Sequence, residues 1–210
     1  MKLLSIKQAY SKTFKTLDLD DDWKSIFGEV EKTGRWTIYG REKHGKTITM
    51  LMLAKMLSAH GKVACVLAEE GISKNVIDTM KKVGIDDKNR QIGITGYESW
   101  ENLEQRIAKR QSAWCWIIDN ITVYKDEASK KQLLELSRKF ENDKLIIFLA
   151  HEERKEPEGA IARLWKKLSQ IIIRVEGLIA EVSGRCPGGQ IIINEEKANI
   201  YWGTEKIMTK

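Results

Sequence analysis

Apolar runs and segments with helical spacing alternate through the middle of the chain. Short runs that are almost entirely apolar occur at residues 36–39, 63–68, 114–118 and 145–150. Segments that place apolar residues at helical spacing occur at residues 47–59, 73–83, 99–111 and 129–140. Because strands that are buried on both faces read as continuous apolar runs, this alternation predicts an α/β fold with a mainly parallel central sheet flanked by helices.

The last quarter of the chain has a different pattern. Three strand-like runs follow one another closely, at residues 171–175, 178–182 and 190–194. Gly177 and the glycine-rich residues 184–189 separate them, and such residues are typical of tight turns. The pattern predicts hairpin-connected antiparallel strands at one edge of the sheet.

The first 30 residues are predicted to form an N-terminal arm. A short amphipathic segment precedes the acidic run at residues 18–22, which is suited to the start of a helix that contains Trp23 and Phe27. A length of 210 residues favours one core over two equal domains. We therefore divide the chain into an arm at residues 1–30, an α/β domain at residues 31–205 and a tail at residues 206–210.

Charge and cysteine content set broad limits on the function. The chain has 36 basic and 30 acidic residues and a net charge of +6, which permits attraction to nucleic acid but equally fits a well-solvated surface. Cys65 and Cys115 fall in apolar runs, so we expect buried thiols and a reducing compartment. The first residues lack the apolar core of a signal peptide and charges interrupt the other apolar stretches, so we expect a cytoplasmic protein without membrane contact.

A complete phosphate-binding loop (P-loop) follows the first predicted strand. The glycines of this Gly-x-x-x-x-Gly-Lys-Thr sequence permit a tight turn whose amides point at phosphate oxygens, helped by the positive end of the following helix. Lys46 is expected to reach the β- and γ-phosphates of ATP, and Thr47 to offer a hydroxyl to Mg²⁺. The residues expected to bind the nucleotide are Gly40, Arg41, Glu42, Lys43, His44, Gly45, Lys46, Thr47 and Ile48.

Three carboxylates are predicted to lie at the same edge of the sheet as this loop. Asp119 ends a buried strand, where P-loop proteins place the acidic residue of the Mg²⁺ shell. Glu69 and Glu70 follow the strand after the loop's helix, so they could orient water toward the γ-phosphate. A turn aspartate and a solvated pair at a helix start remain the alternatives for these positions.

With these motifs the chain resembles the RecA-like ATPases, in the branch of the RadA-type repair proteins, the circadian-clock ATPases and the hexameric replicative helicases. The resemblance covers about residues 28–203. It rests on residues 40–47, 67–71, 117–119, 148–151 and 182–189. It implies a RecA-like P-loop NTPase fold with C-terminal antiparallel hairpin strands, and ATP and Mg²⁺ as the bound cofactors.

The resemblance also assigns roles to individual residues. It implies that the glutamate pair activates water and that His151, at the end of the fourth strand, senses the γ-phosphate, where relatives often carry Gln. It implies that Arg185 reaches into a neighbouring subunit's ATP site, with Arg174 as the other candidate, while Ser183 replaces a second basic residue. The catalytic residues expected on this basis are Glu69, Glu70, Lys46, Arg185 and His151.

The resemblance implies a homo-oligomer, either a ring or a filament, that hydrolyses ATP and acts on single-stranded DNA in replication, recombination or a mobile element. Basic residues occur in the loops predicted after Asp119 and His151, but acidic residues accompany them. The alternative is a nucleotide-gated assembly or regulatory ATPase that binds protein partners. A small-molecule kinase fits the length of the chain but not the glutamate pair or the C-terminal hairpin.

Several aromatic residues are candidates for contacts with partners. Trp23 and Phe27 of the arm are predicted to dock on the next subunit. Trp100, Trp165 and Trp202 could be exposed platforms on which bases stack, although tryptophans more often anchor a core or an interface.

Overall fold

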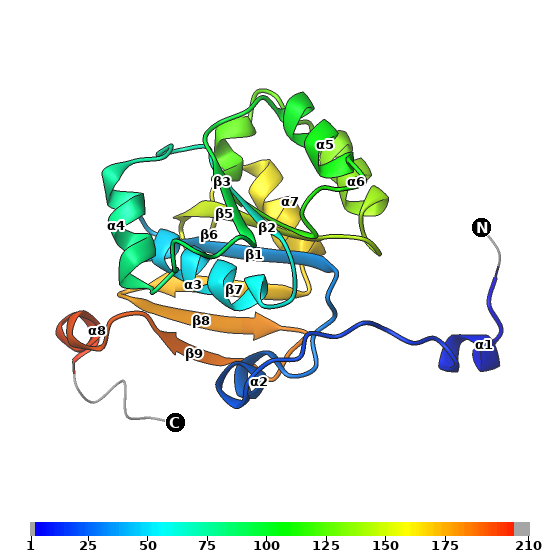
Figure 1. Ribbon diagram of the computed structural model, residues 1–210, viewed down its shortest axis with the longest axis horizontal. Helices are drawn as coiled ribbons and strands as arrows, with labels where there is room; N and C mark the ends of the chain where they lie inside the picture. The colour runs from blue at the N-terminus through cyan, green and yellow to red at the C-terminus, as the bar shows by residue number, and fades with distance from the viewer. Residues whose placement is uncertain (1–2, 204–210) are drawn as a thin grey trace.

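A computed structural model describes residues 3–203, and one mixed sheet runs through this part of the chain (Figure 1). The strand order is β3-β2-β4-β5-β1-β7-β8-β9, and β6 pairs with β5. Neighbouring strands from β3 to β7 in this order are parallel, whereas β7, β8 and β9 pair antiparallel. The strands are β1 Gly34–Gly40, β2 Val63–Leu67, β3 Ile92–Thr95, β4 Cys115–Asp119, β5 Leu145–Glu153, β6 Glu156–Pro157, β7 Ile171–Glu176, β8 Ile179–Gly184 and β9 Gly189–Ile192. The predicted mainly parallel sheet with antiparallel strands at one edge is confirmed.

Helices cover both faces of this sheet (Figure 1). One face carries α2 (Asp21–Phe27), α3 (Lys46–Ser58) and α4 (Lys74–Lys82), and the other carries α5 (Trp100–Ala108), α6 (Lys130–Lys139) and α7 (Ala160–Leu168). The remaining helical segments are α1 (Ile6–Tyr10), the 3-10 turn η1 (Ile121–Tyr124) and α8 (Glu195–Trp202). Within residues 3–203, no helix is long and apolar enough to cross a membrane.

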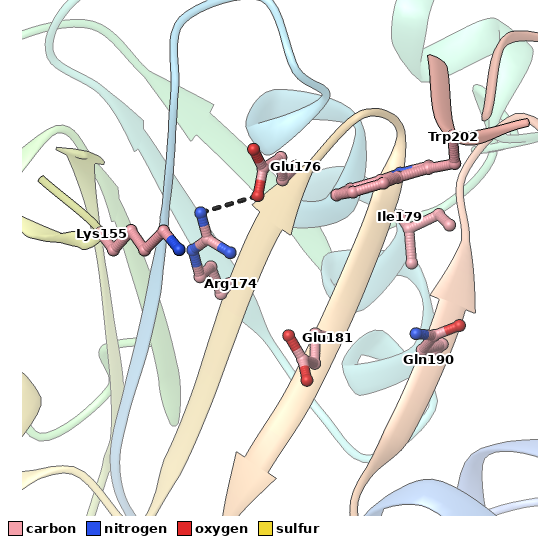
Figure 2. A pocket seen from close by; sticks show the side chains of 7 residues that line it. All are labelled: Lys155, Arg174, Glu176, Ile179, Glu181, Gln190 and Trp202. Atoms are coloured by element: carbon pink, nitrogen blue, oxygen red, sulfur yellow. Dashed lines mark ion pairs between the residues drawn. The ribbon is translucent and has the colours of Figure 1, made fainter. Parts of the chain in front are cut away.

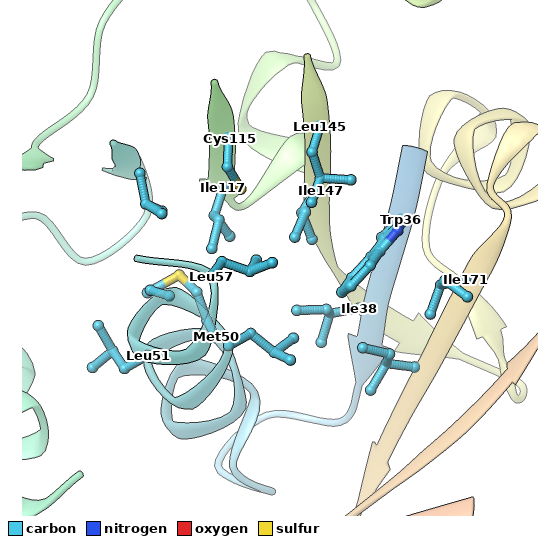
Figure 3. Packing of buried hydrophobic residues seen from close by; sticks show 14 of the residues in the cluster. Trp36, Ile38, Met50, Leu51, Leu57, Cys115, Ile117, Leu145, Ile147 and Ile171 are labelled. Carbon is cyan, nitrogen blue, oxygen red and sulfur yellow. The ribbon is translucent and has the colours of Figure 1, made fainter. Parts of the chain in front are cut away.

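The apolar cluster around α3 fixes the two elements on either side of the P-loop (Figure 3). Met50, Leu51 and Leu57 of α3 are fully buried, because the helix packs against the sheet and against α4. Trp36 and Ile38 of β1 belong to the same cluster. A helix with apolar residues on most sides is typical of such a position. Since both β1 and α3 are buried, the loop between them begins and ends at fixed points.

The N-terminal segment divides into an exposed part and a part that packs on the sheet. Residues 3–16 are exposed throughout, whereas Leu17 is buried. Phe27 is 1% exposed and stacks on Trp36 with 5.1 Å between ring centroids. The prediction that Phe27 docks on another subunit is therefore wrong, because this side chain contributes to its own core. The predicted tail at residues 206–210 lies outside the described residues.

Two tryptophans considered as base-stacking platforms are also core residues. Trp100 and Trp165 are 3% and 1% exposed, and both belong to the cluster on the face of the sheet opposite α3. Phe148 of β5 lies between them in this cluster, with its ring 4.6 Å from that of Trp165. The stacking hypothesis is therefore wrong for Trp100 and Trp165, whose indole faces are covered by protein.

The end of β1 passes very close to β7. Gly40 pairs with His151 of β5 on one side and with Val175 of β7 on the other. A Cβ added at Gly40 would lie 2.1 Å from the carbonyl oxygen of Val175. Because this obstacle is backbone, no side-chain rotation can remove it. The close packing of β1 on β7 therefore requires glycine as the first residue of the P-loop sequence.

Gly40→Ala should lower the free energy of unfolding by about 1–3 kcal/mol, because β1 and β7 would have to separate. Urea unfolding followed by circular dichroism measures the change. Gly96→Ala is the matched control, since an added Cβ there meets no atom within 4 Å. Equal stability of the two variants would contradict the close packing of β1 on β7.

Near the same point, ion pairs join the two strands that lie on either side of β1. The side chain of Glu152 in β5 is 2% exposed and accepts hydrogen bonds from Arg174 of β7 at 2.8 and 2.9 Å. Arg174 also contacts Glu176 at 2.7 Å, and Arg41 lies 3.9 Å from Glu152. The hydrogen bonds from Arg174 hold the pKa of Glu152 below its ordinary value. Because β1 lies between β5 and β7, this pair links the two strands across the strand that carries the loop.

Glu152→Gln should lower the free energy of unfolding by about 1–3 kcal/mol at neutral pH, because charge-assisted hydrogen bonds are lost. A carboxylate whose pKa is lowered by folding stabilises the folded state above its unfolded pKa, and this contribution disappears as the pH falls through the folded pKa. The difference between wild type and Glu152→Gln should therefore shrink below about pH 4. Urea unfolding across this pH range, with exposed Glu141→Gln as the control, tests this; a difference independent of pH would refute it.

Candidate nucleotide site

The P-loop turns sharply and is attached to the turn that joins β7 and β8. Lys43 and Gly45 have φ angles of 61° and 107°, both in the left-handed region, so the chain reverses before α3 begins. The carbonyl oxygen of His44 accepts a hydrogen bond from the Leu178 amide at 3.3 Å, and its Nδ1 accepts one from the Gly177 amide at 2.9 Å. These bonds hold one side of the loop against the antiparallel part of the sheet.

A pocket of about 700 Å³ opens beside the loop, at the edge of the sheet where the parallel strands end. It brings together most of the predicted site, namely the loop, both glutamates after β2, the aspartate that ends β4 and the histidine in β5. Its size suits a small-molecule ligand. The lining residues are Glu42, Lys43, Gly45, Lys46, Thr47, Ile48, Glu69, Glu70, Asn75, Thr79, Asp119, His151, Leu178 and Lys197.

Three residues of the predicted loop do not line the pocket. Gly40 lies in β1, and His44 is directed at the turn between β7 and β8. The side chain of Arg41 lies near Glu152, while its carbonyl oxygen accepts a hydrogen bond from Lys46 at 2.9 Å. These residues shape the loop, and the pocket itself is formed by the other predicted loop residues.

A chain of hydrogen bonds links the loop lysine to a glutamate at the end of β2. Lys46 Nζ lies 3.3 Å from His151 Nδ1, and His151 Nε2 lies 2.9 Å from Glu69 Oε1. Because an ammonium group can only donate, Nδ1 accepts here, and the ring proton is on Nε2 and is donated to Glu69. The other carboxylate oxygen of Glu69 accepts from Asn120 Nδ2 at 3.2 Å. The chain holds Glu69 from two sides, through residues of β5 and of the segment after β4.

The residues predicted to bind Mg²⁺ share the pocket. Asp119 is 6% exposed, and burial, reinforced by the charge of Glu69, raises its pKa to about 6. Burial likewise lowers the pKa of Lys46. Both shifts disfavour the charged forms. A bound nucleotide would give Lys46 a negatively charged phosphate as its partner, and the cation bound to that phosphate would give Asp119 a positively charged one.

The donor set near Asp119 fits Mg²⁺ held together with a nucleotide. The Thr47 hydroxyl and the Asp119 carboxylate are the oxygen ligands that this ion prefers. Residues 3–203 contain no group of three or more His, Cys, Asp or Glu side chains that could hold a metal on its own. Oxygens from a polyphosphate and from water would therefore complete the coordination.

The two glutamates after β2 have different surroundings. Glu69 belongs to the hydrogen-bond chain with His151. Glu70 instead accepts hydrogen bonds from Ser73 at 2.8 Å and from Asn75 at 3.1 Å, at the start of α4. Both side chains line the pocket, but Glu69 alone is connected to the loop lysine.

Neither arginine predicted to act on a neighbouring site reaches the pocket of its own chain. Strand β8 runs antiparallel to β7, so its last residue, Gly184, pairs with Ile171 at the start of β7. Arg185 follows there, with its amide donating to the carbonyl of Gln170 at 2.7 Å, at the opposite edge of the sheet from the loop. Arg174 lies nearer to the loop, but two carboxylates of its own chain compensate its charge.

Four lining residues were not predicted, and neither was Asn120, which directly follows Asp119 and donates a hydrogen bond to Glu69. Asn75 and Thr79 lie one turn apart on α4, a spacing that places both on one face of the helix. Leu178 and Lys197 come from the turn after β7 and from α8, where the pattern of the sequence gave no sign of a ligand.

A second pocket, of about 450 Å³, lies over the antiparallel strands (Figure 2). Arg174 and Glu176 form an ion pair on one side of it, and Trp202 of α8 covers the other. It shares no lining residue with the pocket beside the P-loop. It is lined by Lys155, Arg174, Glu176, Ile179, Glu181, Gln190 and Trp202.

The sequence matches no protein-family model and no curated protein. Among solved structures, the chain is similar to the flagellar accessory protein FlaH from Methanocaldococcus jannaschii, with a TM-score of 0.62 and 17% sequence identity. The match covers 86% of this chain and 92% of that chain. At this identity the similarity concerns the fold rather than the activity. Together with the strand order and the loop between β1 and α3, it establishes that the chain has a RecA-like α/β fold.

Proposed function

We propose that this protein binds ATP together with Mg²⁺ in the pocket beside the P-loop and hydrolyses it. The supporting observation is that Lys46 and Thr47 of α3, Asp119 of β4 and Glu69 after β2, which come from three separate segments, converge on one pocket. Lys46 and the amides at the start of α3 bind the phosphates, and Thr47 and Asp119 hold the ion. When bound, Mg²⁺ offsets the negative charge that develops on the transferred phosphoryl group.

Glu69 is the residue that we propose as the base. Hydrolysis needs a group that orients water in line with the γ-phosphate. Glu69 is held by His151 and Asn120 beside Lys46, whereas Glu70 is bound by residues at the start of α4. In this arrangement His151 positions Glu69 and lies close enough to Lys46 to contact the terminal phosphate.

Lys46→Ala should weaken ATP binding by about 10–100-fold, because a charge-assisted contact with the phosphates is lost. Glu69→Gln should retain binding but lower the hydrolysis rate by about 10²–10⁴-fold, whereas Glu70→Gln should have a smaller effect. Titration with a fluorescent ATP analogue and a phosphate-release assay measure the two quantities. Lys24→Ala, an exposed lysine on α2, is the control.

Two results would count against these assignments. Unchanged nucleotide affinity in Lys46→Ala would remove the P-loop proposal. A large loss of hydrolysis in Glu70→Gln, with normal hydrolysis in Glu69→Gln, would transfer the role of the base to Glu70.

The arginine that completes the site is proposed to come from a second copy of the chain. A positive charge near the γ-phosphate stabilises the transition state in many ATPases and GTPases. Arg185 lies at the far edge of the sheet from its own pocket, so it can serve only the pocket of another protomer. A ring or filament in which the far edge of one protomer faces the pocket of the next would provide this contact.

Exposed basic residues in the loops that follow β4 and β5 support single-stranded DNA as the target of the ATPase. Lys125 follows η1, and Arg154 and Lys155 form the tip of the β5–β6 hairpin. None of the three has an ion-pair partner among residues 3–203. The acidic neighbours Glu153 and Glu156 contact basic residues of α7, at 3.8 and 2.9 Å, and so are less available to repel phosphates.

The ATPase rate per protomer should rise steeply with protein concentration, because sites form between copies, and single-stranded DNA should raise it further. Arg185→Ala should keep nucleotide binding and lose the dependence on concentration, with a rate about 10³-fold below that of the assembled wild type. Phosphate release at several protein concentrations and a fixed salt concentration measures this. A wild-type rate that is independent of protein concentration would contradict action between copies.

The second candidate is an ATPase that controls the assembly of protein partners. It is favoured by the structural similarity to a protein described as a flagellar accessory protein. In that case DNA should leave the concentration-dependent rate unchanged, and this outcome of the same experiment would replace the DNA proposal.

A further inference from the structure

Helix α8 is packed closely against the P-loop and the turn between β7 and β8. The Tyr201 ring meets the His44 ring edge-on, with 5.3 Å between centroids. Ala198 is fully buried, and the amide of Ile193, just before the helix, donates to the carbonyl of Leu178 at 2.9 Å. At Gly177 an added Cβ would lie 2.2 Å from Tyr201 Cδ1, so the helix and the turn are in direct contact. These contacts give α8 a fixed position next to the loop.

Lys197 lies on the side of α8 that faces the pocket. It precedes Tyr201 by four residues, and residues four apart lie on the same face of a helix. Tyr201 packs on the P-loop histidine, and Lys197 lines the pocket itself. Lys197 is exposed and has no ion-pair partner among residues 3–203. A lysine without a carboxylate partner, at the mouth of a pocket, is available to bind an anion.

The charges around the pocket make this lysine relevant to a phosphate ligand. The acidic side chains in the lining outnumber the basic ones, and each phosphate group that enters adds negative charge. A positively charged side chain within the pocket therefore offsets a large part of the negative charge there. The charged lining residues are Glu42, Glu69, Glu70 and Asp119 on the acidic side, and Lys43, Lys46 and Lys197 on the basic side.

We propose that Lys197 binds the polyphosphate of a nucleotide held in the pocket of its own chain. The inference rests on the proposed nucleotide site and adds a contact from a helix outside the P-loop motif. The ammonium group forms a charge-assisted hydrogen bond with a phosphate oxygen. Because α8 packs on the P-loop of the same chain, this contact is complete within one protomer, in contrast to the contact proposed for Arg185.

The test is equilibrium titration of the full chain with fluorescent ADP and a fluorescent ATP analogue. Lys197→Ala should raise the Kd for both by about tenfold, and Lys197→Arg should restore most of the affinity. The dependence of Kd on salt should be weaker in Lys197→Ala than in wild type, because one phosphate contact is lost. Lys24→Ala is the matched control and should bind as wild type does. Circular dichroism and the melting temperature should not change, since the Lys197 side chain is exposed.

The outcomes separate this inference from the proposed function. If wild type binds and Lys46→Ala does not, but Lys197→Ala binds as tightly as wild type, the role of Lys197 is refuted while the P-loop site stands. If wild type binds neither nucleotide, both proposals fail. Mixing Lys197→Ala with Lys46→Ala protomers should leave binding weak; recovery of tight binding would show that Lys197 serves a neighbour and would overturn the same-chain contact.

Discussion

At Gly40 the backbone of β1 runs against the carbonyl oxygen of Val175, with no room for a side chain. This contact brings the start of the P-loop next to the end of β7 and places the loop beside the turn at Gly177 and Leu178. The same turn packs against α8. The parallel sheet, the antiparallel strands and the last helix therefore meet at one point. Leu178 of this turn and Lys197 of α8 line the pocket, so their positions follow from the close approach of β1 and β7.

The main features of the fold could be predicted because they follow from local patterns. Strands buried on both faces read as apolar runs, and the P-loop sequence fixes where a strand must end and a helix must begin. The burial of Cys65 and Cys115 follows from the same runs and is confirmed. Among the missed elements, β3 and α8 lack such patterns. Strand β3 has four residues and is only partly buried, and α8 has one fully buried residue, Ala198.

Most residues of the site could be predicted from the sequence, but the contacts between them could not. The sequence pattern indicated that Asp119 and His151 end strands and that Glu69 and Glu70 follow one. Because parallel strands end at one edge of the sheet, the approach of these residues to the loop was foreseeable. The pattern did not indicate which glutamate connects to Lys46, because this depends on the rotamer of His151 and on contacts at the start of α4. The burial of Phe27 was missed for a similar reason, since it depends on long-range packing against Trp36.

The two edges of the sheet are short. The outer strands, β3 (Ile92–Thr95) and β9 (Gly189–Ile192), have four residues each, half the length or less of the central β5. A short edge presents few unpaired backbone groups, and this is one way in which proteins prevent the addition of strands from other chains. The carbonyl of Ile26, the penultimate residue of α2, also accepts a hydrogen bond from the amide of Gly188 beside β9. Copies of this chain are therefore expected to meet through side-chain surfaces and loops, and not by backbone pairing between the edge strands of their sheets.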